Sequence, residues 1–412
     1  MSYKCGRGAR DGRRRRAGAS ARFTLALAAF ALFASPAQAQ APESDYSRQG
    51  YKLGGFRLHN SITIDNFYND NVFATDGNKD DDYFVSIVPG LEIESTWLHH
   101  YLSLNAFGTI DRYATVTAED NEEYTVETQG RLDLTEESSL TTVFRQGRDT
   151  VGRTNAENDR RKNPQQLYFY AGELSYDHGF SKIDLTLRGF ARRLDYVKSI
   201  DDDRDRVHYG GRPRLAYRFS PAFSVFLEPG AEIRDYDDKR DNDGVEKSSA
   251  AISGYVGSEF DITSIIRGEL AIGFIHINFD ESSFDDETIP AVKSEVTWDV
   301  TPLTRLDLEV AHRLATTTRQ GASSKTQTLV SLGASHELRR NVILNAQATY
   351  LREDFNDISR DDDNFRFRAG ARYLINRFLS IDLGYRFRLR ETNAPNRDFR
   401  QNVVTLSIEG GL

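Results

Sequence analysis

The sequence is almost free of sulfur, because its 412 residues contain one cysteine, Cys5, and one methionine, Met1. With no cysteine downstream, the chain cannot hold a disulfide scaffold, a zinc–thiolate site, an iron–sulfur cluster, a thiol nucleophile or an acylated lipoprotein cysteine there. Long apolar runs are missing too, and a mean hydropathy of −0.57 excludes a bundle of membrane-spanning helices. With 28% charged residues and a net charge of −9, the chain first resembles an acidic soluble protein.

The first 39 residues have the order of a secretory signal peptide. Eight basic residues between Lys4 and Arg22 precede an apolar stretch at 23–34, which is followed by the small residues Ala37 and Ala39. This order predicts cleavage after Ala39, and the apolar stretch is too short to anchor the chain in a bilayer. The arginine run invites a twin-arginine interpretation, but the rest of that signal is missing, which favours the general secretory route.

Cleavage changes the charge of the chain. Removing residues 1–39 takes away eight basic side chains and one acidic side chain, so the net charge of −9 becomes −16. A nucleic-acid partner is therefore not expected, because binding to phosphates needs a basic face.

Downstream of residue 55, apolar and polar residues alternate in segment after segment. From Leu379 to Arg390 the odd-numbered positions are all apolar or aromatic, and the even-numbered ones are Ser, Asp, Gly and three Arg. Because successive side chains of a strand point to opposite faces, one face is oily and the other is charged. The same alternation occurs at 183–192, 342–350 and 364–373. It predicts strands with lipid on one side and water on the other.

The connections between these segments alternate in length. About nine long polar loops and about eight short turns predict about 18 strands of about ten or more residues each. An even number returns both termini to the periplasmic side. A β-sandwich, a propeller or two tandem all-β domains would also show alternation, but such folds need an apolar inner face. Here the strand positions that alternate with the apolar ones are charged, so an apolar inner face is missing.

Aromatic residues mark both ends of the expected strands, as in the two girdles of a membrane barrel. Those near the short turns are Trp97, Phe219, Phe260, Trp298 and Phe378, and those near the long loops are Tyr83, Tyr124, Tyr168, Phe365 and Phe387. We therefore predict an all-β fold, a transmembrane antiparallel up-and-down β-barrel of about 18 strands in the bacterial outer membrane. It would span residues 56–412, after a signal peptide at 1–39 and a short periplasmic segment at 40–55, which is too short for a plug domain.

The strand positions that carry charged side chains, on the face opposite the apolar one, predict which residues line the lumen. The basic candidates are Arg188, Arg192, Arg212, Arg214, Arg218, Arg366, Arg368, Arg372, Arg386, Arg388 and Arg390, and the acidic ones are Glu228, Glu232 and Glu269. Arginines on one part of the wall and carboxylates on another would set a field across a water-filled pore and orient a polar or anionic solute such as an acidic saccharide. Alternatively, these charges pair with one another across strands and keep the lumen wet.

No metal, cofactor or catalytic group is expected. Acidic clusters at the loop side, such as Asp80 to Asp82 and Asp201 to Asp203, lack the spacing of a calcium loop and are more typical of solvated loop ends. An outer-membrane hydrolase would need Ser or Asp beside His near the membrane surface. Of the eight histidines only His208 is expected near loop acids, so we predict that the protein is not an enzyme.

Two short segments carry a resemblance to a known family. Tyr68 to Ala74 (YNDNVFA) and Tyr385 to Asn393 (YRFRLRETN), followed by Asp398, Phe399 and Asn402, resemble the first loop and the last hairpin of the Putative beta-barrel porin 2 family. The resemblance implies a proteobacterial outer-membrane barrel, and members are often encoded beside machinery for exopolysaccharide or adhesins. It supplies no catalytic residues.

The last strand predicts a partner for assembly. Val404, Leu406, Ile408, Gly410 and Leu412 alternate up to the carboxyl terminus, which resembles the signal read by the barrel assembly machinery, although that signal usually ends in an aromatic residue. We expect a passive porin-like channel, linked to passage of a surface polysaccharide or another polar anionic solute. The alternative is a non-conducting structural barrel whose loops contact lipopolysaccharide or an export partner, and a hydrolase is the third. No oligomer patch is visible.

Overall fold

The computed structural model describes residue 46 and residues 48–158 and 163–412. The predicted signal peptide at 1–39 lies outside the described residues. Almost all of the described chain is β-strand, and its two helical segments are short 3-10 turns, η1 (Thr117–Glu119) and η2 (Ser199–Arg204). Within these described ranges, no helix is both long and apolar enough to cross a membrane.

The described residues form one sheet of 19 strands. The strands are β1 (Tyr51–Leu53), β2 (Phe56–Asn69), β3 (Asp82–Ser95), β4 (Tyr101–Tyr113), β5 (Asn121–Asp133), β6 (Ser138–Val151), β7 (Gln165–Gly179), β8 (Ile183–Tyr196), β9 (Arg206–Ser220), β10 (Phe223–Tyr236), β11 (Ser249–Ile262), β12 (Ile266–Phe279), β13 (Glu287–Thr301), β14 (Thr304–Thr316), β15 (Ser324–Arg339), β16 (Val342–Phe355), β17 (Arg360–Asn376), β18 (Leu379–Thr392) and β19 (Phe399–Gly411).

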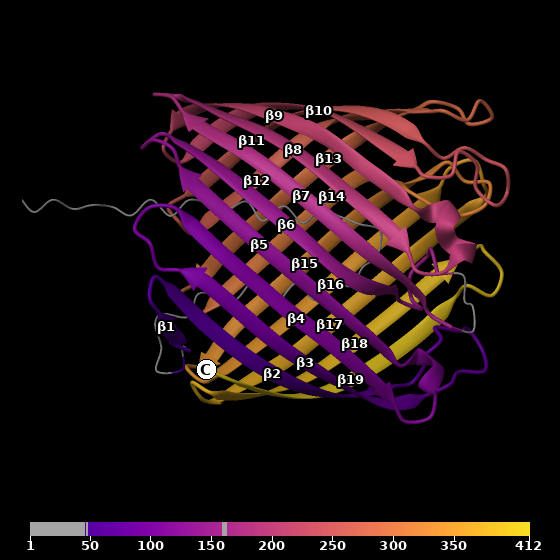
Figure 1. Cartoon of the computed structure of the whole chain (residues 1–412), viewed down its shortest axis with the longest axis horizontal. Coiled ribbons are helices and arrows are strands. Elements are labelled where there is room, and N and C mark those ends of the chain that lie inside the picture. The colour runs from indigo at the N-terminus through magenta and orange to yellow at the C-terminus, as the bar shows by residue number, and fades with distance from the viewer. Residues whose placement is uncertain (1–45, 47, 159–162) are drawn as a thin grey trace, which may run out of the picture.

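The strands β2 to β19 close into a barrel (Figure 1). Each strand pairs antiparallel with the next in sequence, and β19 pairs back onto β2, with Val404 opposite Tyr68 and Ile408 opposite Ile64. The sheet therefore has no open edge along most of its length, which removes the unpaired strand that would otherwise lie in lipid. The predicted closed antiparallel barrel of about 18 strands is confirmed.

The two faces of the sheet differ in chemistry because the pleat alternates. On β9, the outward Leu215 is 52% exposed while its neighbour Arg214 is 8% exposed. On β18, the outward Leu383 is 57% exposed and the inward Arg390 is 2% exposed. Exposed large hydrophobic residues therefore cover the outside, whereas the interior is polar and holds only small apolar clusters instead of one core.

The aromatic residues expected in the two girdles lie at the ends of the strands. Trp97, Trp298, Tyr83, Tyr124 and Phe378 are between 43% and 58% exposed. Some of them pack against their neighbours: the rings of Phe365 and Phe387 lie 6.2 Å apart across β17 and β18. Their placement gives the outer surface an aromatic band at each rim, as a membrane barrel requires.

The segment before the barrel folds back onto one rim. β1 pairs with the first residues of β2, and Arg48 Nη1 lies 2.8 Å from Glu409 Oε1 on β19. This rim also carries the short turns, because β2 begins there and β19 ends there. Of the predicted periplasmic segment 40–55, residues 46 and 48–55 are described, and they lie at the turn side.

Candidate functional site

Strand alternation and register place the expected lumen residues on the inner face of the barrel. They come from two sectors of the wall, β8–β12 and β17–β18. The first contains Arg188 and Arg192 on β8, Arg212, Arg214, Arg218, Glu228 and Glu232 on β9 and β10, and Glu269 on β12; the second contains Arg366, Arg368, Arg372, Arg386, Arg388 and Arg390. The sectors β8–β12 and β17–β18 are separate, so the structure does not gather these residues into one cluster. Their role in passage remains a proposal.

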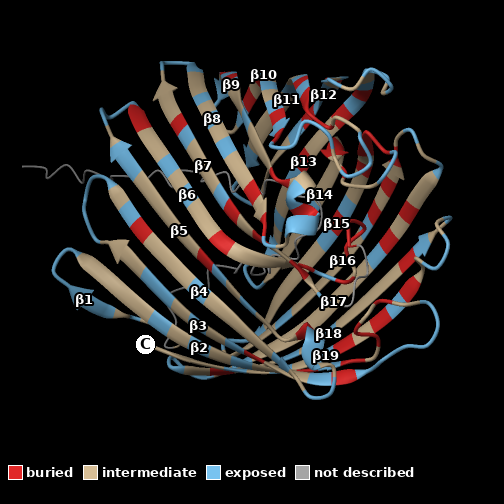
Figure 2. Ribbon diagram, turned by 45° about the vertical axis from the view of Figure 1, so that its right-hand side comes forward, coloured by how far each residue is buried: buried red, intermediate tan, exposed pale blue. Residues whose placement is uncertain are grey.

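One loop crosses the lumen. The β6–β7 loop, described at residues 152–158 and 163–164, starts on one side of the ring, and its Glu157 and Thr154 contact β15 and β18 on the other side. Thr154 accepts hydrogen bonds from Arg388 Nη1 (2.9 Å) and, through its carbonyl, from Arg390 Nη2 (2.7 Å). Near its start, Arg153 pairs with Glu119 of η1. The β6–β7 loop therefore narrows the barrel at the level of the long loops (Figure 2).

A buried ion network holds the β6–β7 loop to β15 and β16. Lys325 Nζ is 2.7 Å from Glu157 Oε1 and 2.9 Å from Glu353 Oε1, and the Lys325 side chain is 0% exposed. Glu157 also accepts hydrogen bonds from Thr317 and Thr318. Burial alone would raise the pKa of Glu157, but Lys325 and Arg319 more than offset it and hold that pKa well below its usual range. Buried ion pairs therefore hold the β6–β7 loop in place.

Other loops pack against the β6–β7 loop and cover part of the mouth. Ala156 belongs to a buried cluster with Ala322 of the β14–β15 loop and Phe355 of β16. In the β2–β3 loop, Asn71 and Ala74 are 0% exposed, and Phe73 lies under the Arg153 guanidinium. The loops therefore cover the mouth of the barrel more completely beside strands β2–β6 and β15–β19 than beside strands β8–β14.

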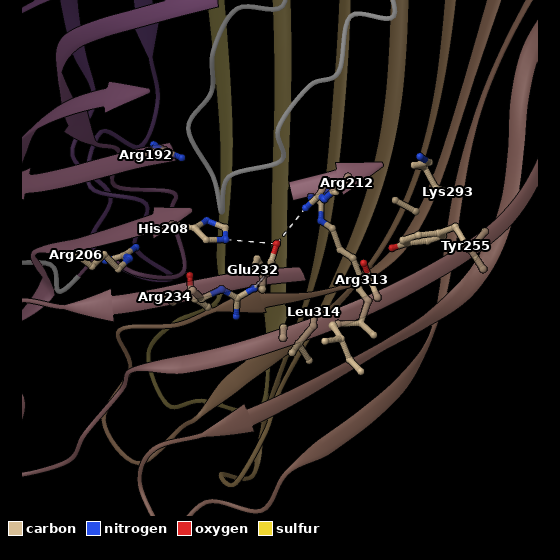
Figure 3. A pocket seen from close by; sticks show the side chains of 18 of the residues that line it. Arg192, Arg206, His208, Arg212, Glu232, Arg234, Tyr255, Lys293, Arg313 and Leu314 are labelled. Carbon is tan, nitrogen blue, oxygen red and sulfur yellow. Dashed lines mark hydrogen bonds and ion pairs between the residues drawn. The ribbon is translucent and has the colours of Figure 1, made fainter. Parts of the chain in front are cut away.

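A cavity of about 270 Å³ lies between the β6–β7 loop and strands β8 to β14 (Figure 3). Its charged lining includes Arg192, Arg206, Arg212 and Arg234. The carboxylate of Glu232 joins three of the basic groups: Arg212 Nη2 lies 3.1 Å away, Arg234 Nη2 2.6 Å away and His208 Nε2 3.4 Å away. A cavity with charges of both signs holds water and polar solutes more readily than apolar ones.

From the wall of this cavity toward the short turns, charged side chains pair with one another. Arg214 donates to Glu228 Oε2 (2.6 Å), to Glu259 Oε1 (2.5 Å) and to Glu269 Oε2 (2.8 Å). Its guanidinium also stacks over Phe226 at 3.9 Å from the ring centroid. Lys293 joins the same carboxylates, at 3.1 Å from Glu228 and 2.9 Å from Glu269. We call Arg214, Glu228, Glu259, Glu269 and Lys293 the paired network.

The β17–β18 wall has the opposite character. Register places Arg366 opposite Arg388 and Arg368 opposite Arg386, so two successive rungs consist of arginine only. Two hydrogen bonds of these arginines go to neutral groups: Arg388 donates to Thr154, and Arg368 donates to Gln347 Oε1. Among the described residues, no carboxylate oxygen lies within 4.0 Å of the guanidinium of Arg366, Arg368 or Arg388. We call these two pairs the arginine rungs.

Sequence reasoning missed the residues that fix the loop. Lys325 and Glu353 occupy the inward parity of β15 and β16, so the alternation could have placed them in the lumen, but nothing in the sequence pairs either with Glu157. It also missed the inward carboxylates Asp111 and Asp149 on the β2–β6 side, which the same parity test would have found.

Several histidines and acidic loop ends have structural partners. On the outer face, His276 and His312 bond to the hydroxyls of Thr288 (2.7 Å) and Thr328 (2.8 Å) on adjacent strands. The acidic residue Asp82 accepts backbone hydrogen bonds from Thr115 and Val116. Within the described ranges, no three His, Cys, Asp or Glu residues are grouped to hold a metal ion.

Comparison with known proteins agrees with the architecture. The copper transporter OprC has 9% identity and a TM-score of 0.50, covering 89% of this chain and 82% of that one. Pseudomonas aeruginosa OccK2 (OpdF) in complex with glucuronate has 14% identity and a TM-score of 0.49, covering 88% and 100%. The outer membrane protein opdK from Pseudomonas aeruginosa has 12% identity and a TM-score of 0.44, covering 86% and 99%. These likenesses concern the fold alone.

Sequence comparison identifies the family. No curated protein matches the chain. The model of one family, Putative beta-barrel porin 2, matches residues 43–410, nearly the whole predicted mature chain. This match and the closed barrel indicate a porin-like channel of the bacterial outer membrane. The resemblance of the first loop and the last hairpin is thereby confirmed, and the chain belongs to the Putative beta-barrel porin 2 family.

Proposed function

We propose that the barrel conducts polar, anionic solutes passively across the outer membrane, through the space between the β6–β7 loop and strands β8 to β14. One observation carries the proposal. The β6–β7 loop narrows the lumen but leaves a cavity of about 270 Å³ whose lining includes Arg192, Arg206, Arg212 and Arg234. A narrow, charged and water-accessible passage selects solutes by size and by charge.

The sign of the charge on the preferred solute follows from where carboxylates lie on the wall of the lumen. Arg214 faces three of them, so its charge is offset locally. On β17 and β18, Arg388 donates to Thr154 and Arg368 donates to Gln347, which are neutral partners, so the positive potential of these two arginines extends into the lumen. The wall also presents amide and hydroxyl groups, such as Asn345 and Thr405, that suit a hydroxyl-rich solute. We propose an acidic saccharide as the solute class and passage of a surface polysaccharide as the biological setting.

A non-conducting barrel is the second candidate. The β2–β3 and β6–β7 loops pack closely enough that Asn71, Ala74 and Ala156 are almost fully buried. Such a cover fits a structural barrel whose loops contact lipopolysaccharide or an export partner. The same loops would then form a binding surface, and the barrel assembly machinery would be needed only for insertion.

Conductance of single molecules separates the two candidates. Purified, refolded barrel is added to a planar bilayer of lipid, and current is recorded at fixed voltage in potassium chloride. We expect stepwise increases in current and, across a salt gradient, a reversal potential of the sign that anion preference gives. Correctly folded barrel that inserts without any stepwise current would overturn the channel and favour the structural barrel.

A further inference from the structure

The cavity beside strands β8 to β14 is bordered by an arginine with unused hydrogen-bond donors. Arg234 donates through Nη2 to Glu232 Oε1 (2.6 Å), whereas its Nε and Nη1 atoms are buried and have no hydrogen-bond partner. The Arg234 side chain is 7% exposed and contributes to the lining of the cavity. A buried donor without an acceptor is unfavourable, and it is worse for a charged group. Arg234 is therefore stabilised by an acceptor that enters the cavity.

Strand register places a second arginine and a histidine beside Arg234. Arg192 on β8 lies opposite His208 on β9, and His208 lies opposite Arg234 on β10. Adjacent strands are about 4.8 Å apart, so the two arginines start about 10 Å apart and their long side chains can reach one anion above His208. Among the described residues, no carboxylate oxygen lies within 4.0 Å of the Arg192 guanidinium. Arg192 can therefore donate to the same anion.

This part of the cavity wall has more arginines than carboxylates to match them. The arginines of β8 to β10 that border the cavity are Arg192, Arg206, Arg212 and Arg234. Of the carboxylates that border it near them, Glu157 pairs with Lys325. Glu228 pairs with Arg214. Only Glu232 is shared with the four arginines, through Arg212 and Arg234. The excess of positive charge therefore exceeds one unit.

The excess charge favours a phosphate group over a carboxylate. A phosphate monoester carries a charge of about −1.5 to −2 at pH 7 and offers three acceptor oxygens. A carboxylate carries a charge of about −1 and offers two acceptor oxygens. Arg192, His208 and Arg234 come from three different strands, so their donors approach an anion from different directions. A tetrahedral group with three free oxygens can accept from all of them.

The rest of the cavity suits the hydroxyl groups of a sugar. Tyr255 and Ser253 on β11 contribute hydroxyls, and the carboxylates of Glu295 and Glu309 lie on facing positions of β13 and β14. Carboxylates accept hydrogen bonds from hydroxyls but repel an anion. Figure 3 shows Tyr255 at the end of the cavity away from Arg192 and His208. This arrangement orients a phosphorylated sugar with its phosphate toward β8 to β10.

We infer that the cavity is a binding site for a sugar phosphate, with Arg192, His208 and Arg234 contacting the phosphate. The residues on β11, β13 and β14 contact the sugar hydroxyls. The volume of about 270 Å³ is close to the smallest ligand pockets, at about 300 Å³, so one sugar unit occupies the site. The inference rests on the proposed function and specifies the anionic group of its solute, because the solute has to enter the lumen to reach the cavity.

Calorimetric titration of the refolded mature barrel in detergent tests the site. The probes are glucose 6-phosphate, glucuronate, glucose and inorganic phosphate, which separate the phosphate from the sugar. We expect glucose 6-phosphate to bind at least about tenfold more tightly than glucuronate, because charge-assisted hydrogen bonds are lost with the carboxylate. Inorganic phosphate should bind at least about tenfold more weakly than glucose 6-phosphate, and glucose should give no measurable heat. Affinity for glucuronate or for inorganic phosphate equal to that for glucose 6-phosphate would overturn the inference.

Two variants address the arginines by different physical routes. Arg192→Gln removes a positive charge that has no carboxylate partner, so it leaves no buried carboxylate unpaired. Arg234→Lys keeps the charge beside Glu232 but removes the Nε and Nη1 donors. Each is expected to weaken the binding of glucose 6-phosphate at least about tenfold. Wild-type affinity in either variant would contradict the site.

The matched control removes an arginine elsewhere on the inner face. Arg131 on β5 pairs with Asp133 and does not border the cavity. Arg131→Gln should therefore bind glucose 6-phosphate as the wild type does. A tenfold loss in this control would show that the net charge of the lumen, and not the cavity, determines the affinity. Retention of the barrel in each variant is checked by circular dichroism and by resistance to unfolding in cold detergent.

The outcomes for the site and for the channel are distinguishable. If the barrel conducts ions but glucose 6-phosphate binds no more tightly than glucuronate, this inference fails and the proposed channel stands. If the wild-type barrel binds glucose 6-phosphate as expected and never conducts, the site stands and the proposed channel fails.

Discussion

Two parts of the inner wall carry arginines in opposite surroundings. In the paired network, Arg214 contacts Glu228, Glu259 and Glu269, and all its charge is matched locally. In the arginine rungs, Arg366 and Arg388 face each other, with Thr154 as a neutral partner. The difference teaches that an inward arginine in a barrel has no fixed role, because its partners across the strand decide whether it stabilises the wall or presents its charge to the lumen.

The physical basis of this comparison is the cost of burying charge. A buried ion that loses its partner is strongly destabilising, because neither water nor a counter-charge remains to solvate it. Removing one of several like charges relieves repulsion instead. Substitutions should therefore lower the free energy of unfolding in the paired network and leave it unchanged or raise it in the arginine rungs. Effects on the passage of solutes and ions should appear mainly when residues of the arginine rungs are changed.

The largest effect is expected where the β6–β7 loop is fixed. Lys325→Met leaves the carboxylates of Glu157 and Glu353 buried without their cation. We expect a loss of about 3–5 kcal/mol in the free energy of unfolding, together with a larger conductance because the loop is released. Urea unfolding followed by tryptophan fluorescence and single-channel recording measure the two effects. Adding Glu157→Gln and Glu353→Gln should recover most of the stability, and a loss under about 1 kcal/mol in the single variant would contradict the network's role.

The second prediction compares the two sectors directly. Arg214→Gln removes the cation shared by Glu228, Glu259 and Glu269, and about 3 kcal/mol of stability should be lost. Arg366→Gln should change stability by less than about 1 kcal/mol, or raise it, because a like-charged neighbour is removed. Both variants are measured by the same urea titration. A larger loss in the free energy of unfolding for Arg366→Gln than for Arg214→Gln would contradict the proposed difference between the two regions.

Ion selectivity sharpens the comparison further. Arg386→Ala with Arg388→Ala removes one strand's share of the arginine rungs, and the anion preference of the channel is expected to disappear. The measurement is the reversal potential across a potassium chloride gradient. Arg131→Gln with Arg145→Gln serves as the control with equal charge removed, and its anion preference should persist. An unchanged reversal potential in the rung variant would place the selective region elsewhere.

A smaller effect is expected from acid. The folded-state pKa of Glu157 lies below its usual range, so its carboxylate contributes stability above the unfolded-state pKa of about 4.3 and loses it as the pH falls toward the folded value. Stability should therefore depend little on this group between pH 8 and 5 and decline below about pH 4. The urea midpoint of Glu157→Gln, measured over the same range, should lack that decline. Identical acid profiles for both proteins would assign the decline to other groups.

The smallest effect is expected on the outer surface. Arg193 and Asp237 form an ion pair near the long loops, with an N–O distance of 2.6 Å and both side chains more than a third exposed. The hydrogen bond from Arg193 lowers the pKa of Asp237. Arg193→Ala should change the free energy of unfolding by less than about 1 kcal/mol, because solvent screens exposed pairs. A change comparable to that of Arg214→Gln would show that exposure does not separate these arginines.

Much of the fold follows from local pattern. The alternation at Leu379 to Arg390 reappears as the strand β18, with its apolar side chains outside and its arginines inside. The lengths of the connections predicted about 18 strands because a long polar segment and a short turn alternate along the chain. Register between strands was not predictable to the residue, so the facing of Arg366 with Arg388 emerges only when β17 and β18 are paired.

Less of the candidate site could be predicted. The alternation placed the arginines on one face, but it did not distinguish Arg214, with three carboxylates, from Arg368, with an amide. The crossing of the β6–β7 loop had no signal at all, since Glu157 and Lys325 are 168 residues apart in the sequence. A polar loop that turns inward and one that extends into solvent have the same composition.

The sequence by itself determined the barrel, its two faces and the position of the loops, because the period of two is a local property of every strand. Only the tertiary structure decided which arginines are neutralised and which present their charge to the lumen. Those outcomes depend on register across strands and on the desolvation of ions brought together over long sequence separations, as in the contact of Glu157 with Lys325. Local pattern contains neither quantity.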